Sequence, residues 1–397
     1  MAIFSEFTIE KCTRTPAQRT ELDKIMRPIL FTQHLLGQQV LDSDWSWLKY
    51  AHIHIIAACI VVYVTFGTLE VIQTTNASLR AEGFYTFMII IGLVLKFFLS
   101  ITNRDNFREM YLTAKTKFFS FIKEVSEETS AFVLKRAQFI VRMLFGVIVF
   151  PVSFYFLTAM FYYVKGTRVT LSKSTSTLMP MTSPYYEIGL VLHAIFMTYA
   201  SFVVLIVDMW FVYMMFFFCV ASDCLSKTLC VPRENGDTDE TYATKLDAAL
   251  RRFYVHHVQQ VRYFNILIKM FKWMAVIPLC HVLICMCLML LIVSQEFNWA
   301  FVSFASNILP TFAELFAYNW YGEQVKTRAN NLSMALLDFD WTCMRPKDKK
   351  KFHIIVTYMK REFGMKTAFG NELSLVTMTS VLKGSYQVFA AMKSIEN

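Results

Sequence analysis

Long apolar stretches alternate with polar connections along the whole chain. Crossing the hydrocarbon layer of a membrane takes about 20 mostly apolar residues in a helix. Six stretches meet this requirement plainly. A seventh has the right length but carries several Ser and Thr residues and Lys383. The stretches are 51–72, 84–103, 139–163, 188–220, 271–294, 299–319 and 373–392. The pattern predicts an all-α membrane protein with seven transmembrane helices.

The composition agrees with this prediction. Hydrophobic residues make up 55% of the 397 residues and charged residues 17%, whereas soluble domains have about 45–50% and about 25%. No Gly/Pro/Ser-rich linker divides the chain, so we expect a single domain over 1–397. It would comprise an N-terminal segment (1–50), spans one to six (51–319), a further connection (320–370) and the last span (371–397).

The distribution of Lys and Arg predicts the orientation, because cytoplasmic connections carry the excess of these residues. Most of them lie in the N-terminal segment and in the connections 104–138, 221–270 and 320–370. The opposite side holds only Arg80, Lys165, Arg168, Lys173 and Lys393. We therefore expect a cytoplasmic N-terminus and an extracellular C-terminus. The net charge of +9 then reflects topology and indicates no nucleic-acid partner.

A glycosylation sequon, Asn76-Ala77-Ser78, falls in a short connection assigned to the outside. Such a sequon can be used only on the exterior side of a membrane protein. Asn76 is therefore a predicted glycosylation site.

The connections on the cytoplasmic side are long and have helical periodicity. Apolar residues recur every three or four positions through 243–268, which predicts an amphipathic helix that continues into the fifth span. The segments 107–138 and 323–362 have a similar pattern. These helices either pack into a common cytoplasmic layer or lie on the bilayer surface. We favour packing, because a simple receptor or carrier would not need so much ordered interior protein.

Ionisable residues within spans are functional candidates, because burying a charge in lipid is costly. Lys96, Arg142 and Glu314 lie near cytoplasmic ends, where we expect their side chains to reach water. Asp208 lies in the inner part of a long span. His54 and His281 lack a second metal ligand three or four residues away on the same helix, so no metal site is expected. With no phosphate loop or nucleophile elbow, we expect no enzyme, no catalytic residue and no cofactor. The candidates are His54, Lys96, Arg142, Asp208, His281, Glu314 and Lys383.

The last span carries a stripe of small and polar residues along one helix face. Such a stripe indicates either close helix packing or the wall of a water-filled pore. In the second case Val388, Phe389 and Met392 could form an apolar constriction. The stripe consists of Ser374, Thr377, Ser380, Gly384, Gln387 and Ala391.

Aromatic and Met residues gather in the outer halves of spans 2, 3, 4 and 6. They indicate either helix packing with an interfacial aromatic belt or an apolar pocket with few polar groups, suited to a small volatile molecule. For the second case, the predicted ligand-binding residues are Phe87, Met88, Phe154, Thr158, Phe161, Tyr162, His193, Phe196, Met197, Phe301 and Phe304.

The last span resembles that of the insect odorant receptors. Their last helix has a Leu-Lys-x-Ser-Tyr-x-x-Phe pattern, matched here by Leu382, Lys383, Ser385, Tyr386 and Phe389. The Thr-Tyr pattern of the related gustatory receptors is absent. The chain is also shorter than the shared odorant co-receptor, so it resembles a tuning subunit.

The resemblance implies a heterotetramer with the co-receptor in the plasma membrane of olfactory sensory neurons. Odorant would bind in the outer half of the bundle and open a nonselective cation pore, and the cytoplasmic helices would anchor the subunits to one another. A register anchored on Tyr386 places Leu382, Ser385, Phe389 and Met392 towards the pore, with Gln387 at the border. The polar stripe favours a face about one position away, and we prefer the register anchored on Tyr386.

Three other functions compete with an odorant-gated channel: a G-protein-coupled receptor, a gustatory-type receptor and a transporter. A G-protein-coupled receptor is disfavoured by the opposite orientation, by the lack of Cys in the exterior loops and by the lack of Asn-Pro-x-x-Tyr in the last span. A transporter is expected to have paired intramembrane charges and an internal repeat, and the sequence suggests neither.

Overall fold

The computed structural model describes residues 21–75, 77–168, 180–295, 306, 308–359 and 364–396. A π-helical turn, Ala114–Phe118, joins α4 to α5, and a short 3-10 helix, Trp341–Cys343, precedes α12. Among the described residues, β-structure is limited to an isolated bridge between Lys366 and Glu372. The predicted all-α fold is confirmed. Its α-helices are α1 (Glu21–Leu35), α2 (His52–Gln73), α3 (Ala77–Thr102), α4 (Arg104–Thr113), α5 (Phe119–Val125), α6 (Glu127–Val164), α7 (Tyr185–Lys227), α8 (Asp239–Met274), α9 (Val276–Gln295), α11 (Ile308–Leu337), α12 (Pro346–Met359) and α13 (Leu375–Glu396).

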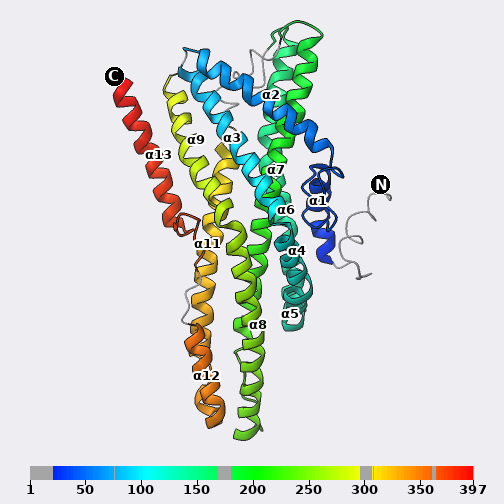
Figure 1. The fold of residues 1–397 in the computed structure, drawn as a ribbon. Coiled ribbons are helices and arrows are strands. Elements are labelled where there is room, and N and C mark those ends of the chain that lie inside the picture. Colours follow the sequence, from blue (N-terminus) through cyan, green and yellow to red (C-terminus); the bar gives the residue numbers. More distant parts are fainter. Residues whose placement is uncertain are drawn as a thin grey trace.

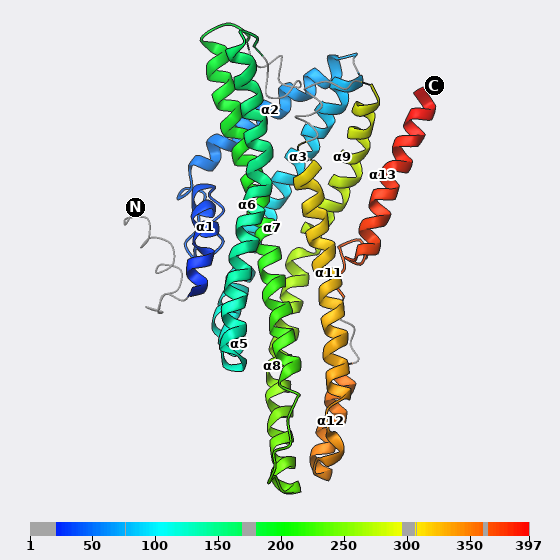
Figure 2. The same ribbon diagram turned by 180° about the vertical axis from the view of Figure 1, so that it is seen from behind.

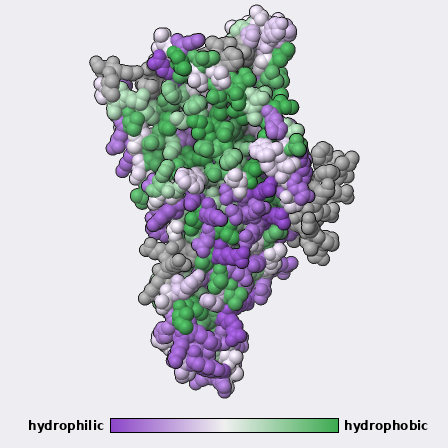
Figure 3. Space-filling view, in the orientation of Figure 1, coloured by the Kyte–Doolittle hydropathy of each residue, from purple (hydrophilic) through white to green (hydrophobic). Residues whose placement is uncertain are grey.

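The molecule has an apolar half and a polar half (Figures 1 and 3). The apolar half contains α2, α3, α9, α13 and large parts of α6, α7 and α11, while α8, α12 and the other end of α11 project from it. Five described helical stretches are long and apolar enough to cross a membrane: His52–Gln73, Gly83–Thr102, Glu127–Val164, Tyr185–Lys227 and Asp239–Leu290. The predicted sixth span starts outside the described residues, and the predicted seventh corresponds to α13.

The helix α7 forms the centre of the apolar half. Of its most apolar 18 residues 89% are buried, compared with 17% for α6 and none for α2. An apolar helix that is buried on all sides belongs to a protein core. The apolar side chains that α2 and α6 leave exposed are suited to lipid, which needs no hydrogen-bonding partner from the protein.

The helix α8 begins with a capping interaction and runs almost without a break into α9. The Thr238 hydroxyl accepts a hydrogen bond from the Thr241 backbone N–H at 3.2 Å, which satisfies one of the unpaired donors of the first turn. Helical hydrogen bonding is interrupted at Ala275, because Pro278 has no N–H to bond the carbonyl of Met274. The predicted amphipathic helix 243–268 leading into the fifth span is confirmed.

The polar helices pack against one another along the long axis of the molecule (Figures 1 and 2). Lys351 Nζ on α12 lies 3.0 Å from Asp247 Oδ1 on α8, and Arg345 donates to the Thr244 hydroxyl at 2.6 Å. The Lys351 ammonium also bonds Asp348 at 2.7 Å and holds the pKa of that carboxyl below its ordinary value. The structure therefore supports packing over a position flat on the bilayer.

A buried ion pair fastens α1 to the rest of the chain. Lys115 Nζ lies 2.7 Å from Asp23 Oδ2, and the Tyr111 hydroxyl donates to Asp23 Oδ1 at 2.6 Å. The lysine and aspartate side chains are 6% and 3% exposed. Breaking a buried pair costs far more than breaking a surface pair, because it leaves one charge buried without a partner.

Asp23→Ala should therefore destabilise the protein by about 3–5 kcal/mol. The measurement is the thermal unfolding midpoint of detergent-solubilised protein, which we expect to fall by several degrees. Glu109→Ala is the matched control, because it removes the exposed pair with Arg262 at 2.7 Å and should cost about 0–1 kcal/mol. Equal effects of the two substitutions would contradict the assigned role of Asp23.

Candidate functional site

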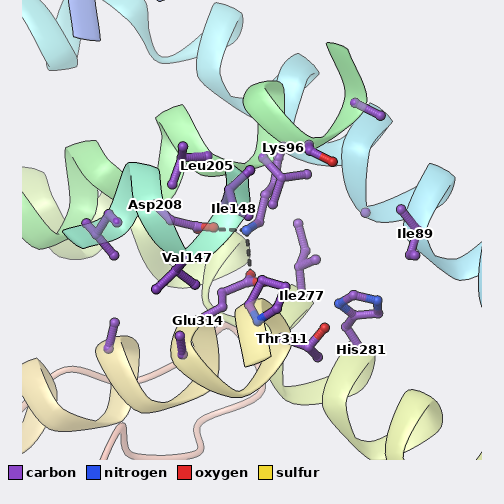
Figure 4. A pocket seen from close by; sticks show the side chains of 18 of the residues that line it. Ile89, Lys96, Val147, Ile148, Leu205, Asp208, Ile277, His281, Thr311 and Glu314 are labelled. Atoms are coloured by element: carbon purple, nitrogen blue, oxygen red, sulfur yellow. Dashed lines mark hydrogen bonds and ion pairs between the residues drawn. The ribbon is translucent and has the colours of Figure 1, made fainter. Parts of the chain in front are cut away.

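A cavity of about 150 Å³ lies inside the apolar half, between α3, α6, α7, α9 and α11 (Figure 4). Most of its wall is apolar, and its ionisable groups gather at one place. A mostly apolar cavity with a few polar groups is the usual form of a small-molecule site. The apolar wall includes Met88, Ile148, Met197, Val204, Leu205 and Ile277.

Helical periodicity explains why these residues meet. On α3 the lining residues Tyr85, Met88, Gly92 and Lys96 follow at spacings of three and four, which places them on one face. The lining positions of α7, from Met197 to Asp208 and Val212, follow the same rule. Each helix thus presents one stripe to the cavity.

Three charged side chains from three helices form a cluster at the cavity wall (Figure 4). Lys96 Nζ lies 2.7 Å from Asp208 Oδ1 and 2.5 Å from Glu314 Oε1. The Tyr318 hydroxyl donates to Asp208 Oδ1 at 3.0 Å. We call Lys96, Asp208 and Glu314 the charged cluster. It joins α3, α7 and α11.

The expectation that Lys96 and Glu314 reach water at the cytoplasmic ends of their spans is wrong. The Lys96 side chain is 1% exposed and the Glu314 side chain 9%. Each side chain finds an opposite charge within the bundle and therefore has no need to extend to the membrane boundary. Asp208, 11% exposed, is likewise held inside the protein.

His281 on α9 lines the same cavity. Its ring stacks on Tyr85 with the centroids 6.3 Å apart, and its Nε2 atom is buried without a hydrogen-bond partner in the described structure. No group of three or more His, Cys, Asp or Glu side chains among the described residues is arranged to hold a metal ion. The cavity wall thus contains carboxylate and imidazole groups together.

The helix α11 continues from the cavity wall to the start of α13. Directly after Tyr318, the buried Asn319 accepts a hydrogen bond from the Ser374 backbone N–H at 3.1 Å. Its amide also donates to the Leu315 carbonyl at 2.9 Å, which fixes its orientation. A Cβ atom at Gly322 would overlap the Leu373 carbonyl oxygen. Close contact at Asn319 and Gly322 thus ties α11 to the N-terminus of α13.

The structure brings two of the predicted ligand-binding residues, Met88 and Met197, into this cavity. Phe87 lines a separate groove between α2 and α3. Six further predicted residues do not line the cavity. Four of them lie on the outer part of α6, namely Phe154, Thr158, Phe161 and Tyr162, and the other two, His193 and Phe196, lie on the first half of α7. Phe301, Phe304 and the predicted glycosylation site Asn76 lie outside the described residues.

A second cavity, of about 710 Å³, lies at the side of α6 and α7 against the chain around Leu36. Its lining includes Tyr155, Phe156, Ala194 and Met197. We call it the lateral cavity. It is an alternative place for a ligand near the predicted aromatic residues of α6.

The helix α13 stands at the edge of the bundle beside α9 in both views (Figures 1 and 2). Of the predicted pore residues, Leu382, Ser385, Phe389 and Met392 are partly or fully buried, and Ser385 is 2% exposed. Phe389 and Met392 pack on Tyr85, Cys285 and Met289. Gln387 is exposed.

The sequence contained a signal for the charged cluster that its interpretation missed. Lys96, Asp208 and Glu314 are one cation and two anions in three different spans, all in the cytoplasmic half under the predicted orientation. Opposite charges at one membrane depth are expected to pair. Comparing both the membrane depth and the sign of each charge would have predicted the cluster. The expectation that the spans lack paired charges, which was used against a transporter, is therefore wrong.

Comparisons with known proteins agree with this architecture. A family model described as 7tm Odorant receptor matches residues 78–386. The fold is similar to the olfactory receptor OR5 of the insect Machilis hrabei in complex with eugenol, with a TM-score of 0.76 at 12% identity, covering 94% of this chain and 98% of that chain. A second structure of the same OR5 receptor gives a TM-score of 0.75 at 13% identity with the same coverage. The sequence matches none of the curated proteins. Because the family model spans most of its length, the chain belongs to the 7tm odorant receptor family.

Proposed function

We propose that this odorant receptor is the ligand-binding subunit of an odorant-gated, nonselective cation channel and has no enzymatic role. A small volatile molecule binds the cavity between α3, α6, α7, α9 and α11, and its binding opens a pore lined by α13. The observation that carries the proposal is the continuity of α11, which contributes Glu314 to the cavity wall and holds the start of α13 through Asn319. A change at the cavity therefore has a short route to the last helix.

The exposed side of α13 supports assembly with other subunits. Val376, Tyr386 and Val388 are 75%, 63% and 46% exposed, although they are large apolar or aromatic residues. We propose a heterotetramer with the shared co-receptor, in which α13 helices surround the pore and the polar helices α8 and α12 anchor the subunits. We further propose that the chain has seven spans, a cytoplasmic N-terminus and an extracellular C-terminus, and that it lies in the plasma membrane of olfactory sensory neurons.

Of two possible registers of α13 towards the pore, we propose the one anchored on Tyr386. In the register anchored on Tyr386, Leu382, Ser385 and Phe389 face the pore, which requires α13 to turn away from α9. In the register of the polar stripe, the exposed residues Ser380 and Gln387 face it directly. Gln387 belongs to both sets and is the position best suited to a first pore substitution.

Co-expression of this chain with the co-receptor should give cation current evoked by volatile molecules, and the current should persist when G-protein signalling is blocked. Patch-clamp recording with a panel of volatiles measures both. An N-terminal epitope should be labelled only after the cells are permeabilised, and a C-terminal epitope in intact cells. Loss of current under the G-protein block would instead favour a G-protein-coupled receptor, and labelling of the N-terminus in intact cells would contradict the orientation.

Filling the cavity should change which volatiles are preferred. Ala200→Leu adds volume to the wall of the cavity, so larger ligands should lose potency about tenfold or more relative to smaller ones. Ala194→Leu makes the same change on the same helix but in the lateral cavity. Dose–response curves for a size series of volatiles decide between them. If Ala194→Leu alone changes the ranking of the volatiles, the ligand binds in the lateral cavity.

Removing the contact between α11 and α13 should alter gating without changing the ligand ranking. Asn319→Leu deletes the acceptor for the Ser374 N–H, a loss of about 1–3 kcal/mol when a buried group is left unpaired. The concentration for half-maximal current should then rise by up to about tenfold. Asn331→Leu, at an exposed position of α11, is the control. An unchanged dose–response curve for Asn319→Leu would show that the contact does not transmit binding.

A further inference from the structure

We infer that the cavity recognises small amphipathic amines, with the carboxylates of Asp208 and Glu314 binding the ammonium group and the apolar wall binding the hydrocarbon chain. The inference rests on the proposed function, because it names the class of volatile molecule that the same cavity takes. Three observations carry it: the charge balance of the cluster, its place in the cavity wall, and the acceptor atoms around it.

The charge of the cluster is not balanced. It holds one ammonium group, Lys96, and two carboxylates, Asp208 and Glu314. No other Lys or Arg is among the described residues that line the cavity. With all three groups ionised, one negative charge is left without a partner, which is unfavourable in an interior of low dielectric constant. A ligand that brings one positive charge removes this imbalance.

All three members of the charged cluster line the cavity, and the Lys96 ammonium group is already paired with both carboxylates. The Lys96 side chain is 1% exposed, whereas those of Asp208 and Glu314 are 11% and 9% exposed. Figure 4 shows the lysine nitrogen between the two carboxylates. A cation that binds at the cluster therefore pairs with the carboxylates.

Acceptor atoms are available for an ammonium group. Asp208 accepts through Oδ1 from Lys96 and Tyr318, and Glu314 through Oε1 from Lys96. These hydrogen bonds use one oxygen of each carboxylate, and a carboxylate can also accept through its second oxygen. The buried Nε2 of His281 in the same wall lacks a hydrogen-bond partner within the described part of the chain. Two carboxylates and one imidazole thus match the three N–H donors of a primary ammonium group.

An aliphatic amine is itself basic and enters the cavity as its ammonium ion. The complex then holds two ammonium groups and two carboxylates and carries no net charge. An alcohol of the same length cannot reach this state.

The test compares hexylamine with 1-hexanol on the co-expressed complex. The measured quantity is the ratio of the two concentrations that give half-maximal current. We expect hexylamine to be at least about tenfold more potent than 1-hexanol, and Glu314→Gln to lower this ratio about tenfold by removing the excess charge. Glu323→Gln, on α11 but away from the cavity, should leave the ratio unchanged. Asp208→Asn is the second variant if Glu314→Gln does not reach the cell surface.

The outcomes separate this inference from the proposed function. Equal potency of the two compounds, a preference for 1-hexanol, or a ratio that neither cavity variant changes would overturn the amine site while the channel stands. Current evoked by other volatiles but by neither of these two compounds would also overturn it. A surface-expressed complex that responds to no volatile at all would instead contradict the proposed function.

Discussion

The salt bridges of Lys96 with Asp208 and Glu314 are the interaction on which the packing of the apolar half depends. Lipid offers no hydrogen-bonding partner, so a charge in this half must be paired by the protein. The Lys96 ammonium group meets carboxylates from α7 and α11 at 2.7 and 2.5 Å. These two distances fix the relative positions of three helices and hold open a mostly apolar cavity beside them. Apolar packing between helices is non-directional and would not by itself select this arrangement.

The helix α11 both lines the cavity and contacts the start of α13, because of the order of its residues. Glu314 and Tyr318 face the charged cluster, Asn319 binds the Ser374 backbone, and Gly322 allows Leu373 to approach closely. These positions lie within about two and a half turns of one rigid helix. A displacement at the cavity is therefore not dissipated in a loop before it reaches α13. The second contact of α13, along α9, covers only one of its sides.

The positions of most helices could be predicted from the sequence, because the length of an apolar run and the period of an amphipathic helix are local properties. The run at 51–72 became α2, and the pattern at 243–268 became part of α8. The charged cluster was missed because its members lie far apart in the chain, from Lys96 to Glu314, and each side chain alone is equally consistent with a position near water. The sequence also did not decide which face of α13 contacts its neighbours, because the polar stripe is compatible with both helix packing and a pore wall. Which side of α13 is covered depends on α9, which the sequence of α13 does not specify.

The close contact at Gly322 also restricts natural variation. Any side chain at this position would meet the carbonyl oxygen of Leu373, a backbone atom that cannot rotate out of the way. Among related receptors that keep the link between residues 364 and 374 at its present length, this position is therefore closed to every other amino acid. A relative with alanine or serine there must have moved its last helix, lengthened that link, or both, so this position shows whether two receptors share the same path from α11 to α13.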